Sequence, residues 1–157
     1  MSRPPRRLLA LCAVVVLAVP LAGCGSDDTK ASNQYVSEVN AIQNDVATQF
    51  RQAGTAISPA SSIEADKEAL KQFDAAVSTA VAKLRAVETP DKVKELHADL
   101  VREVDGYHES IAAARKALSA TSQKAVAAAQ AKFASGTTQT SASITTTIDQ
   151  INRKLHD

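Results

Sequence analysis

The chain has 157 residues, about the length of one domain, and its 18 Lys and Arg against 17 Asp and Glu give a net charge of +1. This balance excludes a strongly basic nucleic-acid-binding surface and an acidic disordered tail. Hydrophobic residues at 45% are normal for a globular domain. Aromatic residues at 3%, with no Trp, argue against an all-β fold and against recognition of sugars or bases by ring stacking.

The first two dozen residues have the features of a targeting signal. Arg3, Arg6 and Arg7 precede an uncharged apolar run of 14 residues at positions 8–21. A transmembrane helix needs roughly 20 such residues, so the run is too short to span a bilayer. A basic segment followed by a short apolar core is typical of a signal peptide.

The residues that end this segment, Leu21-Ala22-Gly23-Cys24, resemble the lipobox of bacterial lipoproteins. The resemblance implies that the nucleophilic thiolate of Cys24 takes a thioether-linked diacylglycerol, and that the chain is cut before Cys24. We therefore expect residues 1–23 to be a signal peptide and residues 24–32 a polar, lipidated tether. The expected location is the outer, extracytoplasmic face of the cell membrane, with the lipid as the anchor.

Cleavage at this point would leave a chain without usable cysteines. Cys12 would leave with the signal peptide, and Cys24 would carry the lipid. The remaining chain has 15 cationic and 17 acidic residues, and it has neither a disulfide nor a cysteine metal site. Packing alone must hold the mature domain together.

Apolar residues then recur in steps of three and four, which predicts amphipathic helices. The first helix is expected over about 33–54, with Ser32 as its N-cap and Gly54 as its stop, followed by a loop that contains Pro59. The second helix is expected to be capped by Ser61 or Ser62. Its seam of apolar residues has no interruption: Leu70, Phe73, Val77, Ala80, Leu84 and Val87.

The third helix is predicted to start with Thr89 as N-cap and Pro90 as its first residue, and to run to about residue 118. The region from about 121 to 157 has a fourth apolar seam. Its middle, 135–143, is rich in small polar residues of poor helix propensity. A long helix that is weak or kinked there is expected, with two shorter helices as the alternative.

Amphipathic segments joined by short loops, with no strand-like alternation, predict an all-α fold. We expect residues 33–157 to form an antiparallel four-helix bundle, with three-helix and five-helix variants left open.

Few residues suggest chemistry. The three histidines, His97, His108 and His156, are expected on helix surfaces. A bundle metal site needs ligands from several facing helices, and His97 lies about 16 Å from His108 along one helix. The sequence therefore predicts no tightly bound metal and no cofactor.

No catalytic motif is found either. The sequence lacks a zinc-protease helix, a nucleophile elbow and a phosphate-binding loop, so we expect a protein that is not an enzyme. The best candidate polar cluster borders the glycine at position 106 in the third helix. It consists of Glu103, Asp105, Tyr107 and His108.

The mature part also resembles the small alanine-rich lipoproteins of actinobacteria, in segments 35–40, 89–93 and 96–101. That resemblance implies the bundle and the location but no site residues. The expected function is a lipid-anchored, non-catalytic module that binds or scaffolds another envelope protein or a cell-wall component, without nucleic acid. The alternative is a carrier or sensor of a small ligand, metal or apolar, within the bundle; a cavity lined by seam residues would favour it.

Overall fold

The computed structural model describes residues 27–55, 62–119 and 123–156, and it shows helices there and no strand. The helices are α1 (Asp27–Thr55), α2 (Ile63–Ala86), α3 (Lys94–Asp105), α4 (Tyr107–Ala117) and α5 (Gln123–His156), with a short 3-10 turn, η1 (Asp91–Val93), before α3. The predicted signal peptide, Cys24 and Ser61 lie outside the described residues. None of the helices within these ranges is long and apolar enough to cross a membrane.

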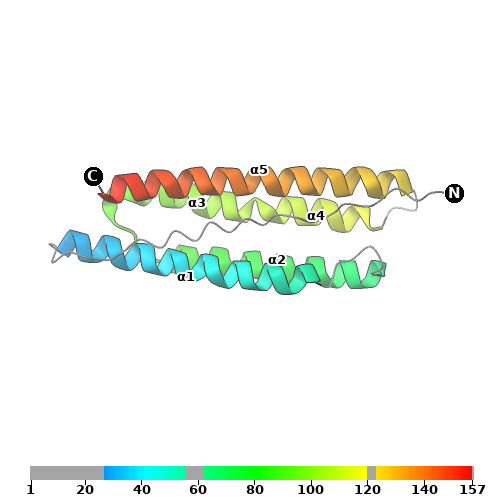
Figure 1. Cartoon of the computed structure of the whole chain (residues 1–157), viewed down its shortest axis with the longest axis horizontal. Coiled ribbons are helices and arrows are strands. Elements are labelled where there is room, and N and C mark those ends of the chain that lie inside the picture. The colour runs from blue at the N-terminus through cyan, green and yellow to red at the C-terminus, as the bar shows by residue number, and fades with distance from the viewer. Residues whose placement is uncertain (1–26, 56–61, 120–122, 157) are drawn as a thin grey trace.

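The helices form an antiparallel bundle, which confirms the predicted fold class. In Figure 1, α3 and α4 follow each other along one side and act as a single rod, so that four rods lie side by side. Helix α1 packs on α2, α2 packs on α3 and α4, and these two pack on α5. Contact between α1 and α5 is marginal at most, so the bundle is open along this fourth side.

The core confirms most of the predicted seam of the second helix. In α2, Leu70, Val77, Ala80 and Leu84 are all buried. Two clusters fill the bundle, and the first contains Tyr35, Val39, Ile42, Ala80, Leu84, Val93, Leu100, Ile151 and Leu155. The second contains Leu70, Val77, Val81, Ile111 and Ala114. Because both clusters lie between positions 35 and 155, the segment from 27 to 156 holds its own core.

The start of α2 agrees with the prediction from the sequence, and the start of α1 does not. The Ser62 side chain accepts a hydrogen bond from the Ala65 backbone N–H at 3.2 Å, which confirms Ser62 as the N-cap of α2. Helix α1 begins at Asp27, six residues earlier than expected, and Ser32 is a buried residue within it. Ser32 therefore does not cap α1, and residues 27–32, expected in the polar tether, are helical. No Gly or Pro interrupts this stretch.

The third predicted helix has a different start and a break. Thr89 does not cap it, because its hydroxyl donates to the Val87 carbonyl at 3.1 Å. Pro90 instead precedes the 3-10 turn η1, and the α-helix starts at Lys94. At Gly106 the helix is interrupted between α3 and α4, although its φ of −58° stays right-handed.

Helix α5 is one element of 34 residues, so the alternative of two shorter helices is wrong. Threonine hydroxyls bond to carbonyls one turn back: Thr137 to Phe133 at 2.9 Å and Thr138 to Ala134 at 2.8 Å. Such bonds satisfy the side chains without ending the helix. Gly136 lets α5 approach α4, because a Cβ atom there would meet the Ser110 hydroxyl oxygen at 2.7 Å.

Candidate functional site

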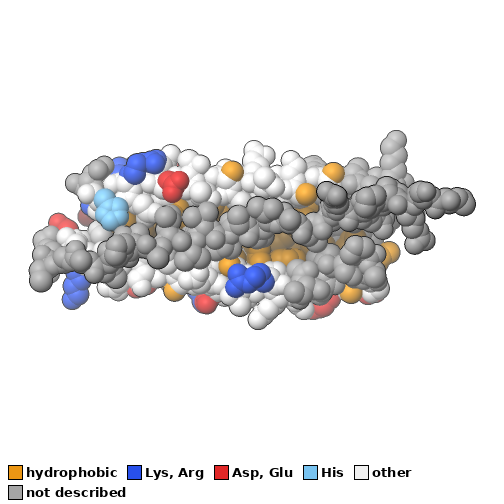
Figure 2. All heavy atoms as spheres, in the orientation of Figure 1, with side chains coloured by type: hydrophobic (Ala, Val, Ile, Leu, Met, Phe, Trp, Pro, Cys, Tyr) orange, Lys and Arg blue, Asp and Glu red, His pale blue; other side chains and the backbone are white. Residues whose placement is uncertain are grey.

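The open side of the bundle is an apolar groove between α1 and α5. Its cavity volume is about 180 Å³. Figure 2 shows a patch of hydrophobic side chains between the two helices near the centre of this face. Apolar and aromatic residues of every helix rod line the groove: Val36, Val39, Ile42, Val46 and Phe50 of α1, Val77, Ala80 and Leu84 of α2, Leu100, Val104 and Tyr107 of α3 and α4, and Ile144 and Ile148 of α5.

Polar side chains lie among the apolar residues along the whole groove. Helices α1 and α5 run antiparallel (Figure 1), so Asn40 and Gln43 of α1 lie in the same half of the groove as Asp149 and Asn152 of α5. Ser141 and Thr145 of α5 line the other half. These side chains offer both hydrogen-bond donors and acceptors.

Aromatic rings cluster at one end of the groove. Phe50 makes edge-to-face contacts with Phe73 and Tyr107, with ring centroids 4.8 Å and 5.9 Å apart. The Tyr107 hydroxyl lies 2.7 Å from the Ser141 hydroxyl of α5, so its polar atom has a partner. Aromatic side chains thus line the groove at the end where Phe50 and Tyr107 lie.

A buried hydrogen-bond chain joins α1, α2 and α3. The Tyr35 hydroxyl donates to His97 Nδ1 at 3.0 Å, and His97 Nε2 donates to the Leu84 carbonyl at 3.0 Å. Tyr35 and His97 are 1% and 8% exposed, so the expectation that His97 lies on the surface is wrong. Burial raises the pKa of Tyr35 to about 12 and lowers the pKa of His97, which keeps both side chains neutral at pH 7.

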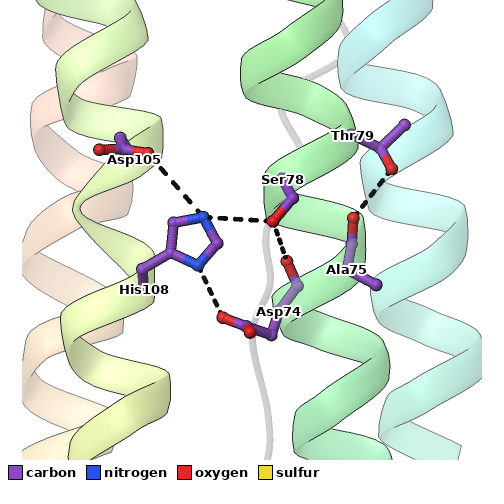
Figure 3. A network of polar contacts seen from close by, with 6 residues as sticks. All are labelled: Asp74, Ala75, Ser78, Thr79, Asp105 and His108. Carbon is purple, nitrogen blue, oxygen red and sulfur yellow. Dashed lines mark hydrogen bonds and ion pairs between the residues drawn. The ribbon is translucent and has the colours of Figure 1, made fainter.

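His108 forms a second network, between α4 and α2 (Figure 3). Its Nδ1 lies 2.6 Å from an Asp74 carboxylate oxygen, and its Nε2 lies 3.5 Å from the Ser78 hydroxyl and 3.8 Å from Asp105. Aspartate, histidine and serine thus stand in the order of a nucleophilic triad. Asp74 and Ser78 are absent from the sequence-based candidates; their four-residue spacing on one helix was the available signal.

The network lacks the other parts of a hydrolytic site. The Ser78 hydroxyl donates to the Asp74 backbone carbonyl at 3.0 Å, so its proton points away from the imidazole. Ser78 lies in the middle of α2, where the backbone N–H groups are engaged in the helix and do not form an oxyanion hole. The arrangement is that of a polar contact between two helices.

The predicted cluster of Glu103, Asp105, Tyr107 and His108 separates into two parts. Asp105 and His108 face α2, as described above. Glu103 and Tyr107 face α5: Glu103 Oε1 accepts a hydrogen bond from the Thr147 hydroxyl at 3.0 Å. The second carboxylate oxygen of Glu103 is buried and has no hydrogen-bond partner among the described residues.

Metal ligands do not converge in the described part of the chain. No group of three or more His, Cys, Asp or Glu side chains there is placed to hold an ion. His156 is exposed at the end of α5.

Comparison with known proteins adds no relative: no protein family, curated protein or solved structure matches this chain.

Proposed function

We propose that the protein is a lipid-anchored, non-catalytic component of the cell envelope that binds an apolar ligand in the groove between α1 and α5. The observation that carries this proposal is the open side of the bundle, where seam residues line a groove instead of packing against the facing helix.

An open apolar seam is unfavourable unless something covers it. In a closed four-helix bundle the seam residues of neighbouring helices interdigitate. Here Val36, Val46, Ile144 and Ile148 stay only partly buried. Exposed apolar surface costs about 25 cal/mol per Å², which a ligand recovers when it fills the groove. This favours an apolar carrier over a purely scaffolding bundle.

The anchor is supported by the lipobox resemblance of residues 21–24. Helix α1 begins at Asp27, three residues after Cys24. Three residues span at most about 10 Å, so a lipid on Cys24 would hold the start of α1 near the membrane surface.

A neutral fluorescent probe, N-phenyl-1-naphthylamine, tests the groove directly. Residues 25–157, which contain the whole described core, should bind one probe with an increase in fluorescence. Val46→Phe, which fills the groove, and Ile144→Asp, which places a charge in it, should each abolish binding while circular dichroism stays helical.

Ile63→Asp is the matched control, since Ile63 is 57% exposed and does not line the groove. It should bind the probe as the unmodified chain does. Absence of probe binding by the unmodified chain, or undiminished binding by the folded Val46→Phe variant, would contradict the proposal.

A further inference from the structure

We infer that a basic cleft between α2 and α4 binds a phosphate group of an anionic ligand. The residues that line the cleft are Lys67 of α2, Ala112, Arg115 and Lys116 of α4, and Ser119 just after α4. The start of α2 and the end of α4 lie at the end of the bundle away from the start of α1 (Figure 1). Among the described residues, none lines both the cleft and the groove, so this inference is independent of the proposed function.

The cleft gathers positive charge from two helices. Lys67, Arg115 and Lys116 are cations, and none of the described residues that line the cleft is acidic. The cavity volume is about 460 Å³, which leaves room for a small anionic ligand. Cations that share a cleft without an acid between them repel one another, and a bound anion replaces that repulsion by attraction.

Arg115 and Lys116 lack the ion pairs that other cations of the bundle form. Elsewhere a cation pairs with the acidic residue three positions before it, as in Glu64–Lys67, Glu68–Lys71, Asp91–Lys94 and Asp99–Arg102. Three and four positions before Arg115 and Lys116, the chain has only alanine and isoleucine. Within the described part of the chain neither of the two forms an ion pair, and both are exposed, so both are accessible to a ligand.

Lys67 adds a cation from the facing helix. Its Nζ lies 2.9 Å from Glu64 Oε1, and the two side chains are 40% and 82% exposed. Exposed pairs contribute only about 0–1 kcal/mol, so Lys67 exchanges this partner for a ligand at little cost. Cations stabilise the C-terminal end of a helix, which accounts for Arg115 and Lys116 but not for Lys67 near the start of α2.

A phosphate group suits these donors better than a carboxylate does. The Arg115 guanidinium binds two phosphate oxygens at once, and lysine ammonium groups neutralise charge on the others. The Ser119 hydroxyl, which donates to the Arg115 carbonyl at 3.4 Å, is a further donor beside them. A phosphomonoester has three acceptor oxygens and about −1.5 to −2 charges at pH 7, whereas a carboxylate has two oxygens and one charge.

The test is an NMR titration of isotope-labelled residues 25–157 with glycerol 3-phosphate at low ionic strength. Saturable shifts should be confined to the amides of Lys67 and of residues 112–119. Arg115→Gln, Lys116→Gln and Lys67→Gln should each weaken binding about tenfold, since each removes a charge-assisted hydrogen bond. Acetate should bind at least about tenfold more weakly than glycerol 3-phosphate.

Arg153→Gln and Lys154→Gln are matched controls. These two residues are also adjacent, exposed cations in the last turn of a helix, but they line neither the cleft nor the groove. Each control variant removes the same charge as its counterpart in α4 and should leave binding nearly unchanged. Equal weakening by the two pairs of variants would mean that overall charge attracts the ligand, and it would overturn the inference.

Three other results would also overturn it: no saturable shifts, acetate binding as tight as that of glycerol 3-phosphate, or undiminished binding by the folded Arg115→Gln and Lys116→Gln variants. Binding of N-phenyl-1-naphthylamine should be the same in these variants as in the unmodified chain, because Arg115 and Lys116 do not line the groove. The cleft and the groove are therefore tested separately.

Flotation with phosphatidylglycerol vesicles identifies the source of the phosphate. If residues 25–157 float with the vesicles and the combined Arg115→Gln and Lys116→Gln variant does not, the phosphate belongs to a lipid head group. If glycerol 3-phosphate binds and the protein does not float, the phosphate belongs to a ligand in solution. Flotation that the combined variant does not reduce would contradict a role of the cleft in binding phosphate on a membrane.

Discussion

At the scale of single residues, the two histidines of the third rod have different roles. His97 is a buried hydrogen-bonding residue that links Tyr35 of α1 to the Leu84 carbonyl of α2. His108 lies at the bundle surface between Asp74 and Asp105. Both positions are histidines eleven residues apart on the same rod, and only the packing of the other helices gives them different surroundings.

Because burial lowers the pKa of His97, acid should destabilise the fold. The folded state favours the neutral imidazole, so this stabilisation is complete above the unfolded pKa of about 6.5 and is lost as pH falls towards the lower folded pKa. Urea unfolding between pH 7.5 and pH 5 should show a decrease in the free energy of unfolding of no more than about 1.4 kcal/mol per pH unit. His97→Asn should remove this part of the slope, and an unchanged slope would contradict the assignment.

The triad-like order of Asp74, His108 and Ser78 is expected to give no nucleophilic catalysis, because the structure around Ser78 lacks an oxyanion hole. Ser78→Ala should leave the slow hydrolysis of p-nitrophenyl acetate unchanged. A fluorophosphonate probe should leave no adduct on Ser78 by mass spectrometry. A Ser78 adduct that His108→Ala abolishes would show that the site is catalytic.

Sequence periodicity predicted the residues that pack locally and missed those that meet across the bundle. Tyr35 lies in the first predicted helix and is buried in the core. Its partner His97 is 62 positions away, so no local pattern could pair them. The cluster around Gly106 was inferred from proximity along the chain, and the helix directs Glu103 towards α5 and Asp105 towards α2.

At the scale of elements, helix α5 forms although part of it has low helix propensity, because tertiary packing and side-chain hydrogen bonds stabilise it. Residues 135–143 are poor helix formers, yet the helix continues through them. The hydroxyls of Thr137 and Thr138 are satisfied by carbonyls of the preceding turn. Gly136 contributes differently, because its missing side chain allows α4 to come close at Ser110.

The two helix-rod glycines should therefore respond differently to substitution. Gly136→Leu should destabilise the fold by about 1–3 kcal/mol through overpacking against Ser110, and Ser110→Gly should restore part of the loss. Gly106 has a right-handed backbone, and a Cβ atom there would lie 3.1 Å from the Glu103 carbonyl oxygen. Gly106→Ala should therefore change the free energy of unfolding by no more than about 1 kcal/mol. Urea unfolding of the three variants and of the unmodified chain measures these changes; equal losses of stability at both glycines would refute the close approach at Gly136.

At the scale of the whole molecule, the open groove depends on how the four rods are arranged around the core. The sequence predicted four rods and their seams, but every rod has a seam, so periodicity alone does not show that α1 and α5 stay apart. That depends on how the rods are arranged around the core, with α2, α3 and α4 joining them on the other sides. The groove is thus a property of the assembled bundle.

The last prediction concerns the expected lipid anchor at Cys24. If the thiol of Cys24 carries the lipid, Cys24→Ala should leave unprocessed precursor or release protein into the medium, while the bundle, whose core begins at Tyr35, still folds. Intact mass spectrometry of the membrane-extracted protein should give a chain that starts at Cys24 and carries the added lipid. Cys24→Ser is the closer control, because its hydroxyl keeps the size of the side chain but is a much weaker nucleophile than a thiolate, so it too should stay unlipidated. A mature protein with a free, unmodified Cys24 thiol would contradict the anchor and leave the groove as a binding site without a fixed place at the membrane.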